Sequence, residues 1–205
     1  LIKNKIIPAK DGKKIIKGLD KIKKQIDNGK FIFKEEFEDI HLNIEKKLYE
    51  IIGDSAGYMH TARSRNDQVV TDFKLWVKES TFLIIKELNS LMKNIVIKAE
   101  KNIGTVMPGF THLKNAQPIS FAHYLLAYYE MLKRDKIRFN NNLELINESP
   151  LGVAALSGTS YKIDRNFTSK KLGFKKPTNN SIDTVSDRDF AIDFLYCSAV
   201  CAMHL

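Results

Sequence analysis

Glycine and proline are scarce in this sequence, with ten glycines and five prolines among 205 residues. They fall in clusters that are separated by long stretches containing neither residue. A protein made of many short strands needs turn residues at closer and more regular spacing, so the pattern argues against an all-β architecture. It favours long helices instead.

Cysteine is rare, and no hydrophobic run is long enough to cross a membrane. The only two cysteines, Cys197 and Cys201, lie in Phe194–Leu205, a run of 12 residues without a charged side chain. A bilayer needs about 20 apolar residues in a helix, so this run predicts a buried helix with both thiols in the core. We expect no membrane partner.

Acidic residues are scarce near the N-terminus, where residues 1–34 hold eleven lysines and only three aspartates. This segment therefore carries eight of the nine net positive charges of the chain. Its lysines alternate at helical spacing with apolar residues such as Ile15, Leu19 and Ile22, which predicts an amphipathic helix with a solvated basic face. The segment has no arginine, so a nucleic-acid-binding surface is the weakest alternative and no nucleic-acid partner is expected.

The spacing of apolar residues predicts an all-α protein. The helix expected from Ser64 to Ile103 would be close to 60 Å long, at about 1.5 Å per residue. Helices of this length bury their apolar stripes only by lying alongside one another, which predicts a bundle extended by subunits of the same kind. Helices are expected at about 9–27, 39–52, 64–103, 118–148, 164–171 and from 183 to the end, with loops at 105–117 and over much of 151–182.

A first polar motif lies at the start of the longest expected helix, in His60–Gln68. Ser64 followed by Asp67 resembles a capping box, in which side chains bond the free N–H groups of a helix start. The same segment holds Arg63, Arg65 and Asn66. Free N–H groups, a positive dipole end and arginines form a suitable site for a carboxylate.

A second polar motif lies in the thirteen residues Thr105–Gln117, between two long expected helices. A loop of this length without structure of its own is uncommon and is often functional. It places Thr111 beside His112, and an imidazole can move a proton near neutral pH. A lone histidine in a loop is more often a surface or packing residue, so both interpretations stay open on spacing alone.

Together these motifs resemble those of the argininosuccinate lyase family, in the aspartase and fumarase superfamily. The resemblance covers about Ile6 to Leu205, and one departure is Ala62, where the family usually has glycine. The segments that carry it are His60-Thr61, Ser64-Arg-Asn-Asp-Gln68, Pro108-Gly-Phe-Thr-His-Leu113, Ala116-Gln-Pro118, Pro150-Leu-Gly152 and Asn180-Ser-Ile-Asp-Thr-Val-Ser-Asp-Arg-Asp-Phe190.

The resemblance implies a long-helix bundle of the aspartase and fumarase type. We expect an N-terminal helical domain over residues 1–60 and a central bundle domain over 61–205 that continues further. The chain starts without methionine and ends on Leu205 within an apolar run, so we expect a fragment cut at both ends, within a bundle helix at the second. A third family motif, a serine-rich loop that supplies the base, would lie beyond Leu205.

The resemblance also implies a reversible β-elimination, in which argininosuccinate is split into arginine and fumarate without a metal or organic cofactor. It implies a cytoplasmic homotetramer in arginine biosynthesis or the urea cycle, whose active sites are shared between subunits. By this analogy His112 is the catalytic histidine. The residues expected to bind the small-molecule substrate are Ser64, Arg65, Asn66, Thr111, Asp39 and His41.

Two other hypotheses stay open. The chain could act on another succinyl-amine substrate such as adenylosuccinate, or it could be a structural protein that has kept the fold and lost activity, as crystallins of this family have. Asp39 also has two compatible interpretations, because its position before an expected helix is typical of an N-cap.

Overall fold

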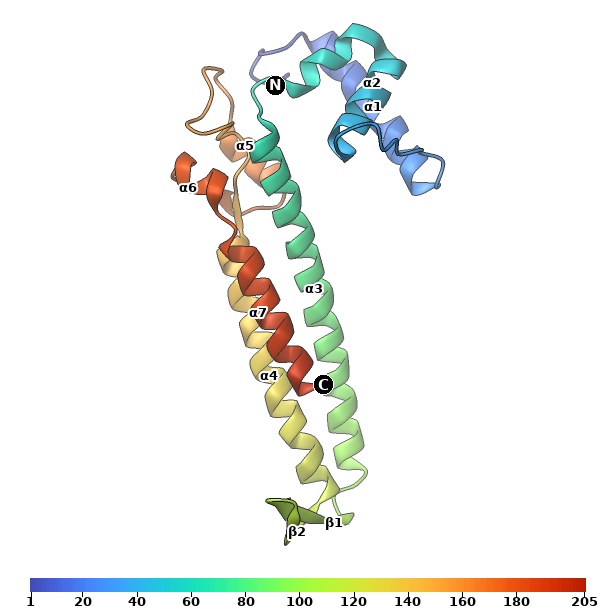
Figure 1. Ribbon diagram of the computed structural model, residues 1–205, viewed down its shortest axis with the longest axis vertical. Helices are drawn as coiled ribbons and strands as arrows, with labels where there is room; N and C mark the ends of the chain where they lie inside the picture. Colours follow the sequence, from blue (N-terminus) through green and yellow to red (C-terminus); the bar gives the residue numbers. More distant parts are fainter. The chain divides into compact units, whose positions relative to one another are not determined.

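The computed structural model describes all of residues 1–205, and contacts within the chain divide it into two units. The first unit comprises Leu1–Gln68, Pro150–Gly173 and Pro177–Val185, and the second comprises Val69–Ser149, Phe174–Lys176 and Ser186–Leu205. Figure 1 labels the elements of both units. The expected domain division after residue 60 is not tested by these units and stays a prediction.

The first unit contains helices α1 (Ala9–Asp27), α2 (Ile40–Ile52), α5 (Arg165–Lys171) and most of α6 (Ser181–Ser186), with a 3-10 helix η1 (Gly53–His60) after α2. The predicted helices at 9–27, 39–52 and 164–171 are confirmed. Asp39 is the N-cap of α2, and its carboxylate accepts a hydrogen bond from the Leu42 N–H at 2.7 Å.

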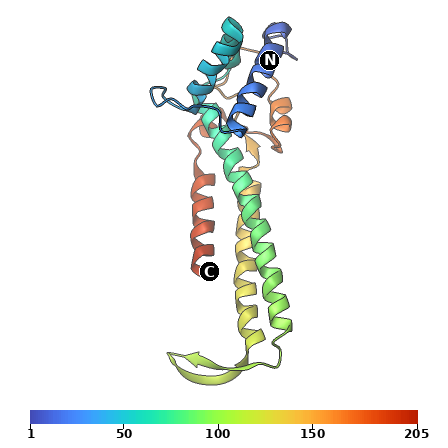
Figure 2. The ribbon, with the colours of Figure 1, turned by 90° about the vertical axis from the view of Figure 1, so that its right-hand side faces the viewer.

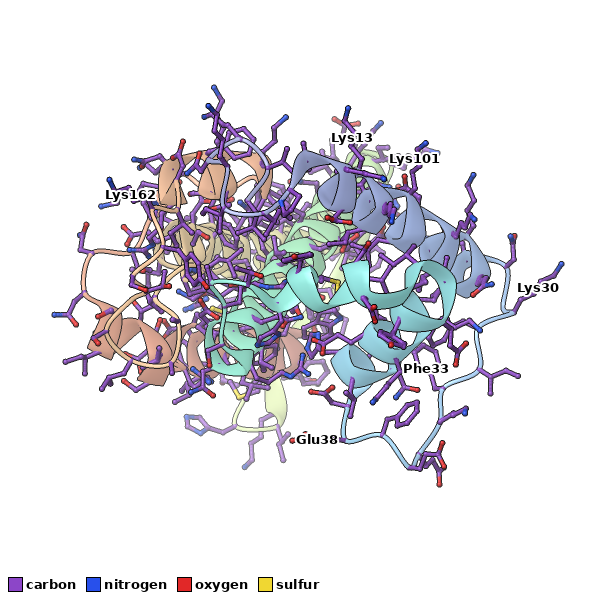
Figure 3. The ribbon with its side chains drawn as sticks, turned by 90° about the horizontal axis from the view of Figure 1, so that it is seen from above. Lys13, Lys30, Phe33, Glu38, Lys101 and Lys162 are labelled. Atoms are coloured by element: carbon purple, nitrogen blue, oxygen red, sulfur yellow. The ribbon has the colours of Figure 1, made fainter.

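Helix α1 packs against α2 through its apolar stripe and exposes its lysines. Ile15, Gly18 and Ile22 of α1 are buried, and Leu48 of α2 is fully buried against them. A Cβ on Gly18 would collide with the Leu48 side chain, so this glycine permits the close approach of the two helices. Every lysine of α1 is exposed, and Lys13 points away from the ribbon in Figure 3. The predicted basic, solvated face is confirmed.

Helices lying alongside one another form the second unit, as Figures 1 and 2 both show. Helix α3 (Arg65–Glu100) begins in the first unit and continues through the second, where α4 (Phe121–Ile146) and α7 (Asp189–His204) accompany it. Their shared core includes Leu88, Leu132 and Phe139. The all-α class is therefore confirmed, and none of the helices combines the length and apolar character needed to span a membrane.

Both cysteines lie in this core, as predicted. Cys197 and Cys201 are buried on α7, and burial raises the pKa of both thiols. The burial of the predicted helix is one-sided, however, because the opposite face of α7 is open. Leu195 is 66% exposed and Met203 is 79% exposed. Within this chain, α7 has neighbours on one face only.

The expected loop at 105–117 is instead a β-hairpin of β1 (Val106–Thr111) and β2 (Lys114–Ser120). The two strands are antiparallel, and Pro108 lies opposite Pro118, so Pro118 is part of a strand and does not begin a helix. Helix α4 begins at Phe121 because the Ser120 hydroxyl accepts a hydrogen bond from the His123 N–H at 3.1 Å. Apart from the hairpin, β3 (Glu148–Ser149) and β4 (Lys176–Pro177) form a short pair.

The last predicted helix is broken in two, at Asp187 and Arg188, between α6 and α7. The Asp187 carboxylate accepts a hydrogen bond from the Asp189 N–H at 2.9 Å and lies 3.2 Å from the Lys74 ammonium. Lys74 is nearly buried, at 3% exposure, and its ammonium lies 5.1 Å from the centre of the Phe190 ring. The Asp187 carboxylate therefore bonds the first residue of α7 and an ammonium of α3, which periodicity does not reveal.

A buried carboxylate joins α4 to α7 in the second unit. Asp135 has no exposed surface, and its carboxylate lies 2.7 Å from His204 Nδ1 and 2.9 Å from the Arg138 guanidinium. A buried carboxylate needs such partners because its hydration is lost. The pair therefore constrains how α7 lies along α4.

We expect Asp135→Ala to lower the free energy of unfolding of the full-length protein by about 3 kcal/mol, because His204 and Arg138 lose the buried acceptor that they bind. Urea denaturation measures the change. Glu130→Ala is the matched control on the same helix, since Glu130 pairs with Lys133 at 3.5 Å on an exposed surface, where such pairs contribute less than about 1 kcal/mol. Equal losses for the two variants would contradict the importance of the buried pair.

Candidate functional site

The start of α3 is capped by two side chains, Ser64 and Asp67. The Asp67 carboxylate accepts a hydrogen bond from the Ser64 N–H at 3.0 Å, and the Ser64 hydroxyl accepts one from the Asn66 N–H at 3.2 Å. Ser64 is half-buried and Asn66 is exposed. The capping interpretation is confirmed, and it leaves the Asn66 side chain facing solvent, where it could meet a ligand.

Asp67 does more than cap the helix. Its side chain has no exposed surface, and its second carboxylate oxygen accepts hydrogen bonds from the Gly152 and Ala154 N–H groups, both at 2.9 Å. Gly152 and Ala154 both adopt positive φ angles, of 99° and 55°. The turn after Pro150 is thus shaped to aim two backbone donors at one carboxylate.

Arg65 lies between two carboxylates. Its guanidinium is 3.2 Å from the Asp39 carboxylate and 3.2 Å from the Glu45 carboxylate. Glu45 also lies 3.5 Å from His60 Nδ1. Two predicted site residues, Asp39 and Arg65, are therefore brought together, and they bind each other.

His41 is placed beside the same motif. Its Nδ1 atom lies 2.8 Å from the Gln68 side-chain nitrogen, and Gln68 in turn accepts a hydrogen bond from Arg65 at 3.3 Å. The structure thus gathers Asp39, His41, Ser64, Arg65 and Asn66 at one place in the first unit. That they bind substrate stays a prediction.

Thr111 and His112 lie at the tip of the hairpin in the second unit. Thr111 pairs with Lys114, and the two residues between them, His112 and Leu113, form the turn with φ angles of 46° and 62°. Two consecutive positive φ angles match the tight turn that antiparallel strands favour, which usually contains glycine or asparagine. A histidine held in this uncommon conformation is consistent with a functional constraint.

The His112 tip and the Ser64–Gln68 motif fall in different units. Val69 follows the motif directly, and Val69–Glu100 is continuous helix within the second unit, about 48 Å long at about 1.5 Å per residue. The hairpin lies beyond the far end of this helix (Figures 1 and 2).

The residue that departs from the resembling family has a visible structural consequence. Ala62 adopts a φ of 62°, in the left-handed region where glycine is favoured. The glycine that the family usually has at this place therefore fits the backbone, and Ala62 adopts the same conformation at some cost in strain.

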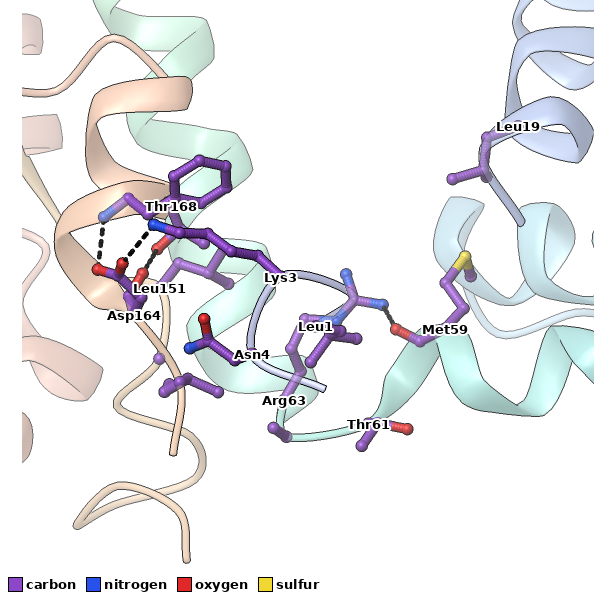
Figure 4. A pocket seen from close by; sticks show the side chains of 14 residues that line it. Leu1, Lys3, Asn4, Leu19, Met59, Thr61, Arg63, Leu151, Asp164 and Thr168 are labelled. Atoms are coloured by element: carbon purple, nitrogen blue, oxygen red, sulfur yellow. Dashed lines mark hydrogen bonds and ion pairs between the residues drawn. The ribbon is translucent and has the colours of Figure 1, made fainter. Parts of the chain in front are cut away.

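A cavity of about 290 Å³ lies beside this part of the first unit. Figure 4 shows Asp164 beside Lys3 on one side and Arg63 donating to the Met59 carbonyl on another. The Phe167 N–H and, next, the Lys3 ammonium lower the pKa of the Asp164 carboxyl. Most of the residues that line the cavity are apolar. Asp164, which also lines it, pairs with Lys3, so the cavity adds no reactive group to the site.

Chemically, the start of α3 can bind an anion and the hairpin tip can move a proton. Ser64, Asn66 and the helix start provide hydrogen-bond donors for a carboxylate, and His112 provides an exposed imidazole. No group of three or more His, Cys, Asp or Glu side chains is arranged to hold a metal ion.

Sequence reasoning missed the partners of these residues. Glu45 lies 20 residues from Arg65, and Gly152 lies 85 residues from Asp67, so no local spacing connects them. Asp67 itself was visible as a capping residue, but its bonds to Gly152 and Ala154 were not. The signal that could have pointed to them is the glycine in Pro150-Leu-Gly152, since glycine often marks a turn.

Comparison with known proteins gives consistent matches over the whole chain. The family model described as "Lyase" matches residues 1–205. The argininosuccinate lyase of Pelagibacter ubique is 63% identical over 205 residues, which are all of this chain and 44% of that protein. That of a Chelativorans species is 56% identical over 98% of this chain and 42% of that protein. The chain therefore spans less than half the length of these relatives.

Solved structures are similar too. The structure of EDDS lyase in complex with formate matches with a TM-score of 0.89 and 30% identity, over 98% of this chain and 39% of that one. Class II fumarase from Schistosoma mansoni matches with a TM-score of 0.77 over 99% of this chain and 51% of that one, at 18% identity. The second likeness concerns the fold alone.

We expect Asp39→Ala to lower the free energy of unfolding by about 1–2 kcal/mol, because α2 loses its N-cap and Arg65 loses one of its two carboxylates. Thermal unfolding of the full-length protein measures it. Glu38→Ala is the matched control, since Glu38 is an adjacent, exposed carboxylate that points away from the ribbon in Figure 3. If both variants unfold at the same temperature, the capping role of Asp39 is wrong.

Proposed function

Because this chain belongs to the lyase family, we propose that it is part of an argininosuccinate lyase. Such an enzyme splits argininosuccinate reversibly into arginine and fumarate, in arginine biosynthesis and in the cytoplasm. The observation that carries the proposal is the likeness of the whole chain to curated relatives of that name. The geometry of the two polar motifs supports it, since anion donors and an imidazole are what the reaction needs.

The reaction begins at the carbon next to a carboxylate of the succinyl group. A base removes a proton from that carbon, and the electron pair spreads onto the carboxylate, which then carries two negative charges. The pair next forms the double bond of fumarate, and the carbon–nitrogen bond breaks. Its electrons stay on the guanidinium nitrogen of arginine, which takes up a proton. The resemblance assigns the base to a serine beyond Leu205.

In this proposal the start of α3 stabilises the doubly charged carboxylate. Asn66 and Ser64 act as donors, and the positive end of the helix dipole adds to them. A preorganised donor aimed at such charge typically contributes about 3 kcal/mol to the transition state. Arg65 acts differently from a free donor, because Asp39 and Glu45 already hold its guanidinium; its effect is to bring Asp39 and α2 to the motif.

Thr111 and His112 act at another face of the substrate. The exposed imidazole takes part in proton transfer, and the Thr111 hydroxyl adds a hydrogen bond to the substrate. Asp39 and His41 are assigned to the arginine moiety, because a carboxylate beside an imidazole suits a guanidinium group.

We further propose that each active site combines motifs from different copies of the chain, in a homotetramer. The five residue-to-residue steps from Ser64 to Val69 can span at most about 18 Å, while the following helix is about 48 Å long and the hairpin lies beyond its end. One copy therefore does not bring Ser64 close to its own His112. The open apolar face of α7 supports additional helices beside it.

We expect the full-length protein to release fumarate from argininosuccinate, and His112→Asn to lower kcat by about 10²–10⁴, the usual contribution of a positioned acid or base. The absorbance of fumarate follows the reaction. Lys114→Gln is the control, because Lys114 is an exposed neighbour in the same hairpin, and it should leave kcat within about twofold.

An unchanged rate for His112→Asn would overturn the assignment of the catalytic histidine. Release of fumarate from adenylosuccinate instead of argininosuccinate would overturn the substrate. A full-length protein that is inactive on both would favour a structural protein of the same fold.

Shared sites predict that two inactive variants restore each other. We expect Asn66→Ala and His112→Asn subunits, when co-assembled in equal amounts, to recover about a quarter of the wild-type activity, since about a quarter of the sites then draw both intact motifs from different copies. Separate preparations mixed without subunit exchange are the control. No recovery in verified mixed tetramers would place both motifs of a site in one copy.

A further inference from the structure

The proposed mechanism leaves one buried charge without a role. Asp67 is fully buried at the start of α3, and it accepts hydrogen bonds from backbone N–H groups of the first unit. A buried carboxylate is costly unless it is well bonded and its charge is compensated. A buried carboxylate at this position therefore indicates a structural or functional role.

Three donors to Asp67 belong to two separate segments. Ser64 donates to one carboxylate oxygen, and Gly152 and Ala154 donate to the other. Hydrogen bonds to a charged acceptor are about twice as strong as neutral ones. The carboxylate therefore holds the turn that carries Ser64 and Asn66 against the turn at residues 151–154.

Arg165 binds the turn at residues 151–154 as well, through its own side chain, and connects it to Thr178. Its guanidinium donates to the Leu151 carbonyl at 3.3 Å and to the Thr178 carbonyl and hydroxyl at 3.1 and 2.9 Å. Burial lowers the pKa of Arg165, and the charge of Asp67 opposes that shift. The side chain also packs so closely on Gly152 that a Cβ there would collide with it.

Ser64 connects Asp67 to the donors of the site. The bond to Asp67 orients the Ser64 backbone, and the Ser64 hydroxyl accepts the Asn66 N–H at 3.2 Å. The place of Asn66, whose side chain is the exposed donor of the motif, thus depends on a carboxylate that is itself inaccessible to substrate.

We propose that Asp67, supported by Arg165, is a positioning residue for the lyase reaction. It holds Ser64 and Asn66 where they meet the substrate carboxylate, and it touches no substrate itself. The inference rests on the proposed function, in which Ser64 and Asn66 are the donors. A displacement of about 1 Å at such donors can cost about 10² in rate.

The test is a double-mutant cycle in the full-length enzyme with Asp67→Asn and Asn66→Ala. An asparagine has one acceptor oxygen, so it cannot accept from both turns. Either the bond from Ser64 or the bonds from Gly152 and Ala154 are lost. We expect Asp67→Asn alone to lower kcat about 10²-fold, and to lower it less than about fivefold when Asn66 is already alanine. A merely structural role predicts the same loss in both backgrounds, and that result would overturn the proposal.

A second measurement does not depend on activity. We expect amide hydrogen exchange at residues 64–67 or 151–154 to quicken at least about tenfold in Asp67→Asn. Asp164→Asn is the matched control, because Asp164 caps α5 in the same unit, by accepting from the Phe167 N–H at 2.9 Å. It should leave kcat and exchange in these two segments unchanged.

If Asp67→Asn does not fold, Arg165→Lys takes its place in the cycle. Lysine keeps the positive charge but loses the forked bonds to Leu151 and Thr178, and kcat should fall about tenfold. Wild-type enzyme that does not cleave argininosuccinate overturns the proposed function. Unchanged exchange, or additive losses in an active enzyme, overturn the positioning role alone.

Discussion

Because a carboxylate loses its hydration when it is buried, the protein around Asp67 must supply donors, and this requirement organises the first unit. Ser64, Gly152 and Ala154 supply them from positions up to 87 residues away in sequence. The same bonds define where α3 begins and why the turn after Pro150 needs two positive φ angles. One side chain thus connects a helix start, a distant turn and, through Arg165, the start of α5.

The second unit depends on the length of its helices. Apolar stripes on α3, α4 and α7 bury one another. Two polar contacts fix their alignment: Asp135 of α4 with His204 of α7, and Lys74 of α3 with Asp187, just before α7. An apolar stripe alone allows helices to slide, whereas a buried ion pair penalises any shift that separates its members. Polar pairs in this bundle therefore specify alignment, and apolar contacts contribute most of the stability.

The two polar motifs differ in how they are held. The Ser64–Asn66 turn is bonded from behind by a buried carboxylate, while His112 lies on an exposed hairpin tip with a left-handed backbone. This contrast suits the proposed division of labour, in which fixed donors stabilise charge and an imidazole approaches from another subunit. The long helix that separates the motifs in sequence is the reason for proposing that a second copy takes part.

Most of the helices could be predicted from the sequence, because their apolar spacing and Asp39 as an N-cap are local features. The polar motifs were visible for the same reason, since unusual residues stood together at Ser64–Gln68 and at Thr111-His112. What a local pattern cannot contain is a partner far along the chain. The hairpin at 106–120 was missed for another reason, because its turn residues, His112 and Leu113, are not the glycine or asparagine typical of such turns. The break at Asp187, the pairing of Arg65 with Glu45 and the bonds from Gly152 to Asp67 were decided only by the tertiary structure, because each depends on groups that folding brings together.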